Sequence, residues 1–242
     1  MYSPKIKRYQ KKFEYSYAFG AYPVLDLINK YSEKVYKVLL KKEGMESEGV
    51  EEISKLCKEK NIDIEINDRL IDKISVKENT YVVGVFKKFE CKLEENSNHL
   101  VLVNPSNMGN IGTIIRTMLG FSVKDLAIIK PSVDIFDPLV IRSTMGAIFH
   151  IRFEFFNSIE EYIERFPKQN IYTFMLKGSK SIQDIKFESP YTLIQGNEST
   201  GLEDKYLGLG QSIYIPHTKD IDSLNLSIAT AIGLWEASKG RG

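Results

Sequence analysis

Three short segments carry side chains that could bind a ligand or take part in a reaction, and each joins an apolar stretch to an expected helix. Their sequences are NPSNMGNIGTIIRT at 104–117, IQGNESTGL at 194–202 and IPHTKDIDSLNLS at 215–227. Each combines glycine or proline with amide, hydroxyl or carboxylate side chains. Because glycine lets a ligand approach the backbone closely, loops of this kind are typical of sites that hold a small molecule.

The first segment places Asn110 near the start of a helix and Arg116 in its second turn. The row around Arg116 is otherwise apolar, and a guanidinium close to a core needs a partner or a substrate phosphate. A structural salt bridge and a functional role are both open for Arg116, and Asn110 is also a favoured turn and capping residue. The segment matches neither the dinucleotide fingerprint nor the ATP phosphate loop, which argues against both kinds of site.

The second segment is expected to end a strand at Gly196, so that Asn197 and Glu198 face the crevice at the carboxyl edge of a sheet. A simple turn followed by a helix cap is the alternative for these residues. In the third segment a short strand leads through a polar loop into the last helix. Ser223 is a candidate N-cap of that helix, and Asn225 is expected in its first turn.

Strands alternate with helices along the chain, which predicts an α/β fold. A basic extension is expected over residues 1–20, a small α/β unit at 21–90, a polar linker at 91–98 and a larger unit with a mostly parallel sheet at 99–242. The larger unit contains apolar runs that predict strands at 100–103, 126–130, 151–156, 171–175, 191–195 and 212–215. Helices are expected near 138–148, 158–166 and 202–207, and the last helix has one apolar face made of Leu224, Ile228, Ala231 and Trp235.

Basic residues cluster near the N-terminus around Tyr9 and Phe13, namely Lys5, Lys7, Arg8, Lys11 and Lys12. They could form an arm that contacts RNA phosphates while an aromatic ring stacks on a base. A solvated chain end is the alternative. The formal net charge of the chain is +1, which gives no general argument for a nucleic-acid partner.

The composition is that of an ordinary soluble protein, with 43% hydrophobic and 27% charged residues. No stretch reaches the ~18 consecutive apolar residues that a membrane span requires. The N-terminus lacks the apolar run of a secretory signal, so we expect a cytoplasmic location and no membrane partner. Cys57 and Cys91 lack a C-x-x-C spacing or a nearby histidine cluster, so neither a disulfide nor a metal site is expected.

Taken in order, the three segments resemble the three motifs of the SpoU/TrmH-like branch of the SPOUT RNA methyltransferases. The resemblance covers about 99–237, and RSTMGAIFHI at 142–151 looks like the stretch between the first and second motifs. It implies a methyltransferase domain with a deep trefoil knot, S-adenosylmethionine held in the knot, and a homodimer with its active site built across the interface. The stretch 21–89 resembles, more loosely, the small RNA-binding α/β domain that precedes the catalytic domain in many such enzymes.

Carried over position by position, the resemblance implies catalytic roles for Asn110, Arg116, Glu198, Ser223 and Asn225. It implies cofactor contacts from Gly196, Asn197, Glu198, Ile215, Leu224 and Asn225. The sequence departs from the family pattern at Asn104, Ser199, His217 and Lys219, without losing a polar group that the chemistry needs; His217 is expected to be a loop residue. Arg116 stays protonated, so we expect it to clamp an RNA phosphate beside the target ribose rather than to act as a base, and the proton acceptor is left unassigned.

The function expected from this resemblance is methylation of a ribose 2′-hydroxyl in structured RNA, with S-adenosylmethionine as the methyl donor. Methylation of a base nitrogen is the first alternative, and the pair Asn110 and Arg116 favours ribose over it. A non-catalytic RNA-binding protein with the same fold is the second, against which the intact polar residues of all three motifs argue. The two-domain arrangement favours ribosomal RNA over transfer RNA, although neither charge nor motif identifies the RNA or the nucleotide.

Overall fold

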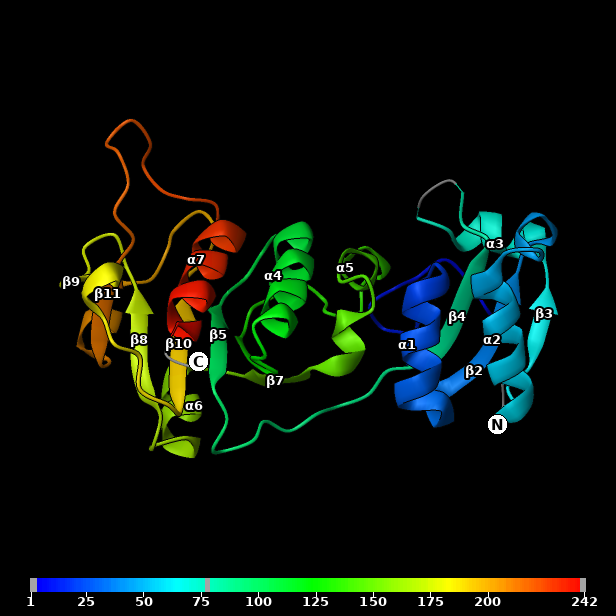
Figure 1. Ribbon diagram of the computed structural model, residues 1–242, viewed down its shortest axis with the longest axis horizontal. Helices are drawn as coiled ribbons and strands as arrows, with labels where there is room; N and C mark the ends of the chain where they lie inside the picture. The colour runs from blue at the N-terminus through cyan, green and yellow to red at the C-terminus, as the bar shows by residue number, and fades with distance from the viewer. Residues whose placement is uncertain (1–3, 77–78, 240–242) are drawn as a thin grey trace. The chain divides into compact units, whose positions relative to one another are not determined.

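The computed structural model describes residues 4–76 and 79–239, and the chain forms two compact units (Figure 1). Unit 1 contains the chain up to Phe89 together with Asp134–His150. Unit 2 contains Glu90–Val133 and the chain from Ile151 onward. The division therefore differs from the one expected from sequence, because a stretch inside 99–242 packs with the first unit.

Unit 1 is built on a mixed four-stranded sheet in the order β1-β4-β2-β3. β1 and β2 both run antiparallel to β4, whereas β3 runs parallel to β2. The strands are β1 (Tyr15–Phe19), β2 (Val35–Leu40), β3 (Ile64–Ile66) and β4 (Val82–Lys87), and the helices are α1 (Ala21–Tyr31), α2 (Glu48–Glu59), α3 (Asp68–Ile74) and α5 (Pro138–Ser143). β1 lies inside the stretch 1–20 that was expected to be an extension, and all five of its residues are buried because α1 and α5 pack against it.

Unit 2 is built on a seven-stranded parallel sheet in the order β7-β6-β5-β10-β8-β11-β9. The strands are β5 (His99–Val103), β6 (Asp125–Ile129), β7 (Arg152–Phe156), β8 (Asn170–Phe174), β9 (Lys180–Ser181), β10 (Tyr191–Gln195) and β11 (Gln211–Tyr214). The α/β class and the parallel sheet are confirmed, and each predicted strand is present to within one residue. β9 is a two-residue strand that the sequence did not indicate.

Helices cover both faces of this sheet. α4 (Met108–Gly120) and α7 (Leu226–Ser238) lie side by side on one face (Figure 1). α6 (Ile159–Arg165) contributes Ile159 and Tyr162 to a core cluster that includes Val101 of β5 and Ile194 of β10. None of the helices in the described ranges is long and apolar enough to cross a membrane.

Three of the predicted helices differ from the observed ones. The helix expected at 138–148 ends at Ser143, because Met145 and Gly146 have φ angles of 52° and 92°, which interrupt a right-handed helix. The helix expected at 202–207 is a 3₁₀ helix over Asp204–Gly208. The last helix begins at Leu226, so the prediction that Ser223 is its N-cap was wrong; Asn225 is the N-cap, and its side chain accepts from the backbone N–H of Ser227.

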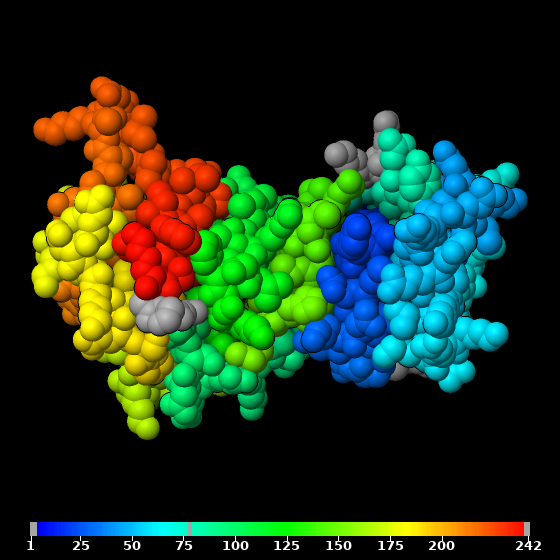
Figure 2. Space-filling model, viewed as in Figure 1, coloured from blue at the N-terminus to red at the C-terminus, as the bar shows by residue number. Residues whose placement is uncertain are grey.

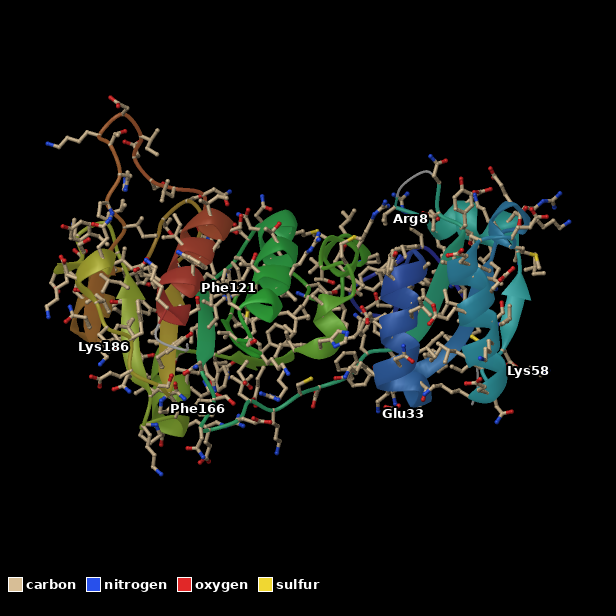
Figure 3. All side chains as sticks on the ribbon, viewed as in Figure 1. Arg8, Glu33, Lys58, Phe121, Phe166 and Lys186 are labelled. Atoms are coloured by element: carbon tan, nitrogen blue, oxygen red, sulfur yellow. The ribbon has the colours of Figure 1, made fainter. Side chains whose placement is uncertain are left out.

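A buried polar network joins the segment before β5 to the amino edge of the sheet in unit 2. His99 is fully buried, and its Nε2 donates to the carbonyl of Glu94 at 2.7 Å, which leaves Nδ1 to accept from the hydroxyl of Tyr162 at 2.7 Å. Phe166, labelled in Figure 3, packs edge-on against the imidazole. Burial lowers the pKa of His99, so the ring is neutral at pH 7. These polar groups serve packing at the amino edge, whereas the three candidate segments lie at the opposite edge.

Candidate functional site

Glu198 joins the first and second segments at the carboxyl edge of the sheet. One carboxylate oxygen accepts from the backbone N–H and the hydroxyl of Ser106, at 3.0 and 2.8 Å. The other accepts from the backbone N–H of Asn107 at 3.1 Å and from the side-chain amide of Asn110 at 3.3 Å. This close approach follows from the strand order, because β5 and β10, which lead into these segments, are neighbours.

The environment of Glu198 keeps its carboxylate ionised. Burial would raise its pKa, but the hydrogen bonds donated by Ser106 and Asn110 outweigh burial and hold the pKa below its ordinary value. The N-terminal end of α4 is beside it, where a negative charge is favourable. A carboxylate that already accepts four hydrogen bonds is a poor proton acceptor, so the geometry fits a positioning role for Glu198.

The third segment is joined to this cluster through Asn225. Its side-chain amide donates to Oδ1 of Asn110 at 3.2 Å. Its own Oδ1 accepts from the backbone N–H and the hydroxyl of Ser227 at the start of α7, at 2.8 and 2.7 Å. Glu198, Asn110 and Asn225 therefore form one continuous hydrogen-bonded chain that connects three segments far apart in sequence.

Asn197 shapes the loop that follows β10. Its side-chain amide donates to the carbonyl of Asn104 at 2.7 Å, and its Oδ1 accepts from the backbone N–H of Ser199 at 2.8 Å. Asn104 has a φ of 50°, a conformation that asparagine adopts more readily than most residues. The departure from the family pattern at Asn104 is therefore accommodated, since the contact made there uses its backbone carbonyl.

A cavity of about 450 Å³ opens beside the cluster, between the second and third segments and the chain that follows β8. Five of the six predicted cofactor-binding residues line it, namely Gly196, Asn197, Glu198, Ile215 and Leu224. The sixth, Asn225, lies between two lining residues, Leu224 and Leu226. The polar loop after β11, orange in Figure 2, stands out from the surface of unit 2 and contributes His217 and Asp222 to the wall.

The sequence did not indicate the wall that follows β8. Leu176 and Lys177 line the cavity, as does Gln195 at the end of β10. The stretch after β8 contains no amide or glycine pair of the kind that marked the other segments. Ser199 and His217, two of the departures from the family pattern, line the cavity as well.

The cavity has the properties that an adenosine-containing ligand requires. A Cβ atom on Gly196 would lie 2.2 Å from the carbonyl carbon of Gly201, so the loop packs backbone against backbone at this wall of the cavity. Leu176, Ile213 and Leu224 provide apolar wall, and the side-chain nitrogen of Gln195 is buried without a partner among the described residues. In the same ranges of the chain, no group of three side chains is arranged to hold a metal ion.

Two of the five predicted catalytic residues lie outside the hydrogen-bonded chain. Arg116 is exposed on α4, and no ion pair or hydrogen bond is found for it within 4–76 and 79–239. The expectation that it lies close to a core was wrong, because Ile115 and Met118 face the sheet while Arg116 points away. Ser223 lines the cavity but, in the described part of the chain, has no hydrogen bond to the three connected residues.

The basic residues near the N-terminus lie in unit 1 with exposed side chains (Arg8 is labelled in Figure 3). Their backbone is held against β1: the hydroxyl of Tyr15 donates to the carbonyl of Lys5 at 3.1 Å, and that of Tyr17 donates to the carbonyl of Lys7. Apolar and aromatic residues from the same stretch, Ile6, Tyr9 and Phe13, pack against the core of unit 1. The segment is therefore ordered, with its charges directed to solvent.

Comparison with known proteins finds a match between residues 97–235 and the SpoU rRNA Methylase family. An uncharacterized tRNA/rRNA methyltransferase of Borreliella burgdorferi is 32% identical over 78% of this chain and 92% of its own length. The 23S rRNA (guanosine(2553)-2′-O)-methyltransferase of Bacillus subtilis is 27% identical over 59% of this chain, and the match spans 58% of that protein. The crystal structure of an AdoMet-bound rRNA methyltransferase from Sinorhizobium meliloti superposes with a TM-score of 0.80 at 26% identity, covering 94% of this chain and 88% of that one.

Proposed function

The chain belongs to the SpoU rRNA methylase family, and we propose that it transfers a methyl group from S-adenosylmethionine to a ribose 2′-hydroxyl in structured RNA, with ribosomal RNA as the favoured substrate. The observation that carries the proposal is the hydrogen-bonded chain of Glu198, Asn110 and Asn225 beside the cavity. The ribose 2′-O specificity named for the Bacillus relative supports the choice of ribose over base.

The cavity walls would hold the cofactor mostly through backbone. Gly196, Asn197 and Glu198 of the second segment line the cavity, as do Ile215 and Leu224 of the third. Bound there, S-adenosylmethionine supplies an electrophilic methyl group. The contribution of the chain is to orient this group relative to the RNA and to exclude water, which for an in-line transfer can account for much of the rate enhancement. Knotting of the chain at this site remains part of the proposal; the insertion of β10 between the earlier strands β5 and β8 supports it.

In this proposal, a second copy of the chain completes the active site. α7 exposes Trp235 (55%) and Ile228 (52%), and the ring of Phe121 at the end of α4 lies 6.1 Å from that of Trp235. Phe121 is labelled in Figure 3. Large apolar side chains that gather on one exposed face mark an interaction surface. A homodimer through α4 and α7 would cover them and would place Arg116 of one copy at the cavity of the other, where its guanidinium can clamp an RNA phosphate.

Unit 1 is proposed to bind the RNA substrate through the ordered basic segment near the N-terminus. Because the hydroxyls of Tyr15 and Tyr17 already hold its backbone, little backbone conformational entropy is lost when phosphates bind. In this division of labour unit 1, which includes the basic segment near the N-terminus, binds the RNA, and unit 2 carries the methyltransferase site.

Replacing Lys7 and Arg8 together with glutamine is expected to weaken RNA binding and to lower the slope of log affinity against log salt by about 1 to 2, since each lost phosphate contact removes roughly 0.7–0.9. Filter binding to rRNA fragments over a salt series measures this. The matched control replaces Lys55 and Lys58 on α2 with glutamine; both are also exposed in unit 1 (Lys58 is labelled in Figure 3). Equal slopes for both double variants would show that the segment is an ordinary solvated chain end.

Nucleoside mass spectrometry of separated rRNA and tRNA from a strain lacking this protein, compared with its parent, tests the function. The expected result is loss of one 2′-O-methylated nucleoside from one rRNA, restored by the intact gene. Loss of a 2′-O-methylated nucleoside from tRNA would identify tRNA, rather than rRNA, as the substrate. Loss of a base-methylated nucleoside would support the base-methylation alternative. If no nucleoside changes and the purified chain does not bind S-adenosylmethionine, the non-catalytic RNA-binding alternative replaces the proposal.

A further inference from the structure

A buried amide with an unused hydrogen-bond donor faces the cavity. Gln195 is the last residue of β10, its side chain is 3% exposed, and it lines the cavity. Its Nε2 has no hydrogen-bond partner among the described residues. Because buried polar groups in native proteins are nearly always hydrogen-bonded, this donor points to a ligand that supplies the acceptor.

The position of Gln195 distinguishes it from Thr173, whose buried hydroxyl also lacks a partner in the described chain. Thr173 of β8 is paired with Ile194 and shares its face of the sheet, where Ile194 belongs to the core cluster with α6. Successive residues of a strand point to opposite faces, so Gln195 points away from that cluster. Thr173 does not line the cavity, and the unused donor of Gln195 is the one that a ligand there can reach.

The part of the cavity around Gln195 is apolar. Phe174 and Ile213, paired on neighbouring strands, are buried and line it together with Leu226 at the start of α7. Of the charged lining residues, Lys177, Asp204 and Asp222 lie on exposed segments, and the carboxylate of Glu198 is already held by Ser106, Asn107 and Asn110. A ligand with a flat aromatic base at one end and a charged amino-acid group at the other would therefore place the base beside Gln195.

We infer that Gln195 is a specificity-determining residue that recognises the purine base of the cofactor, its side-chain amide donating a hydrogen bond to a ring nitrogen at the edge of the base. This inference rests on the proposed function, because it takes the cavity as the site of S-adenosylmethionine. An adenine edge presents ring-nitrogen acceptors beside an amino donor, and a glutamine amide, which carries both a donor and an acceptor, is complementary to such an edge.

The test is calorimetric titration of the full chain and of Gln195→Leu with three ligands: S-adenosylhomocysteine, 5′-methylthioadenosine, which keeps the base but lacks the amino acid, and S-inosylhomocysteine, whose base has a protonated nitrogen where adenine has an acceptor. The expected result is an affinity for both adenine ligands that falls about tenfold in the variant. The preference for adenine over hypoxanthine is expected to be lost at the same time.

The leucine variant is expected to melt at or above the parental temperature, because it removes an unpaired buried amide without leaving a large cavity. If it does not fold, Gln195→Met serves the same purpose. Parental affinity for 5′-methylthioadenosine, or weaker binding with the adenine preference intact, would overturn the inference while leaving the proposed function in place. A parent chain that binds neither S-adenosylmethionine nor S-adenosylhomocysteine would overturn the proposed function itself.

Discussion

Arg116→Ala is expected to lower the rate of methyl transfer to RNA by about 10²–10³-fold, the loss typical of removing a donor that stabilises developing charge. Cofactor affinity is expected to stay within about twofold, because Arg116 is exposed on α4 and does not line the cavity. Single-turnover methylation of a bound transcript measures the first quantity, and calorimetric titration with S-adenosylhomocysteine measures the second.

Arg116→Lys is the matched control for this prediction. Lysine keeps the positive charge but not the planar fork that binds a phosphate through two parallel hydrogen bonds, so an intermediate rate is expected. The melting temperature should not change in either variant, since no ion pair is described for Arg116. Methylation by the alanine variant at the parental rate would rule out the phosphate clamp.

The strands of unit 2 could be predicted from sequence because parallel strands that are buried on both faces appear as short continuous apolar runs, as at Leu100–Val103 and Tyr191–Gln195. β1 could not, because its aromatic residues follow directly on a basic segment and its burial depends on α5, which lies more than a hundred residues away. The break after Ser143 depends on the positive φ of Met145, which residue type does not predict.

The part of the candidate site that was predictable from sequence is the set of polar side chains in the three motifs. Asn110, Glu198 and Asn225 were singled out by the motifs, and they are joined in the structure. Ser106 was not, although its backbone N–H and hydroxyl both donate to Glu198. The wall at Leu176 was missed for a different reason: it reaches the cavity only because β8 lies beside β10, a long-range pairing that no local pattern encodes.

The orientation of Arg116 follows from the helical spacing of its buried neighbours and not from the apolar residues next to it in sequence. Ile111, Ile114, Ile115 and Met118 are buried along α4, so a helical repeat of 3.6 residues places Arg116 on the opposite side. The apolar row around Arg116 suggested a core position, but the helical spacing alone predicts exposure. Trp235 belongs to the apolar face predicted for the last helix, and its exposed position supports a covering partner.

Gly196→Ala is expected to weaken cofactor binding by at least about tenfold. A tenfold loss of affinity corresponds to roughly 1.4 kcal/mol of binding free energy, and overpacking typically costs about 1–3 kcal/mol. The added Cβ would lie 2.2 Å from the carbonyl carbon of Gly201 and 2.5 Å from the backbone nitrogen of Leu202, so backbone rather than a flexible side chain must move. Gly208→Ala is the control, because nothing lies within 4 Å of a Cβ there. Titration with S-adenosylhomocysteine compares the two, and equal affinities would mean that the loop after β10 does not form the cofactor wall.

A mixed dimer of Gly196→Ala and Arg116→Ala then separates the two arrangements of the active site. If Arg116 acts on the cavity of the partner copy, one of the two sites in each heterodimer combines an intact cavity with an intact arginine. At a cofactor concentration near the parental dissociation constant, Gly196→Ala alone is largely unloaded and Arg116→Ala alone is nearly inactive, whereas heterodimers isolated through two different affinity tags are expected to regain about half of the parental rate. If Arg116 instead acts on the cavity of its own chain, the site with the intact cavity lacks its arginine and the site with the arginine lacks its cavity, so the heterodimer stays as inactive as the two variants.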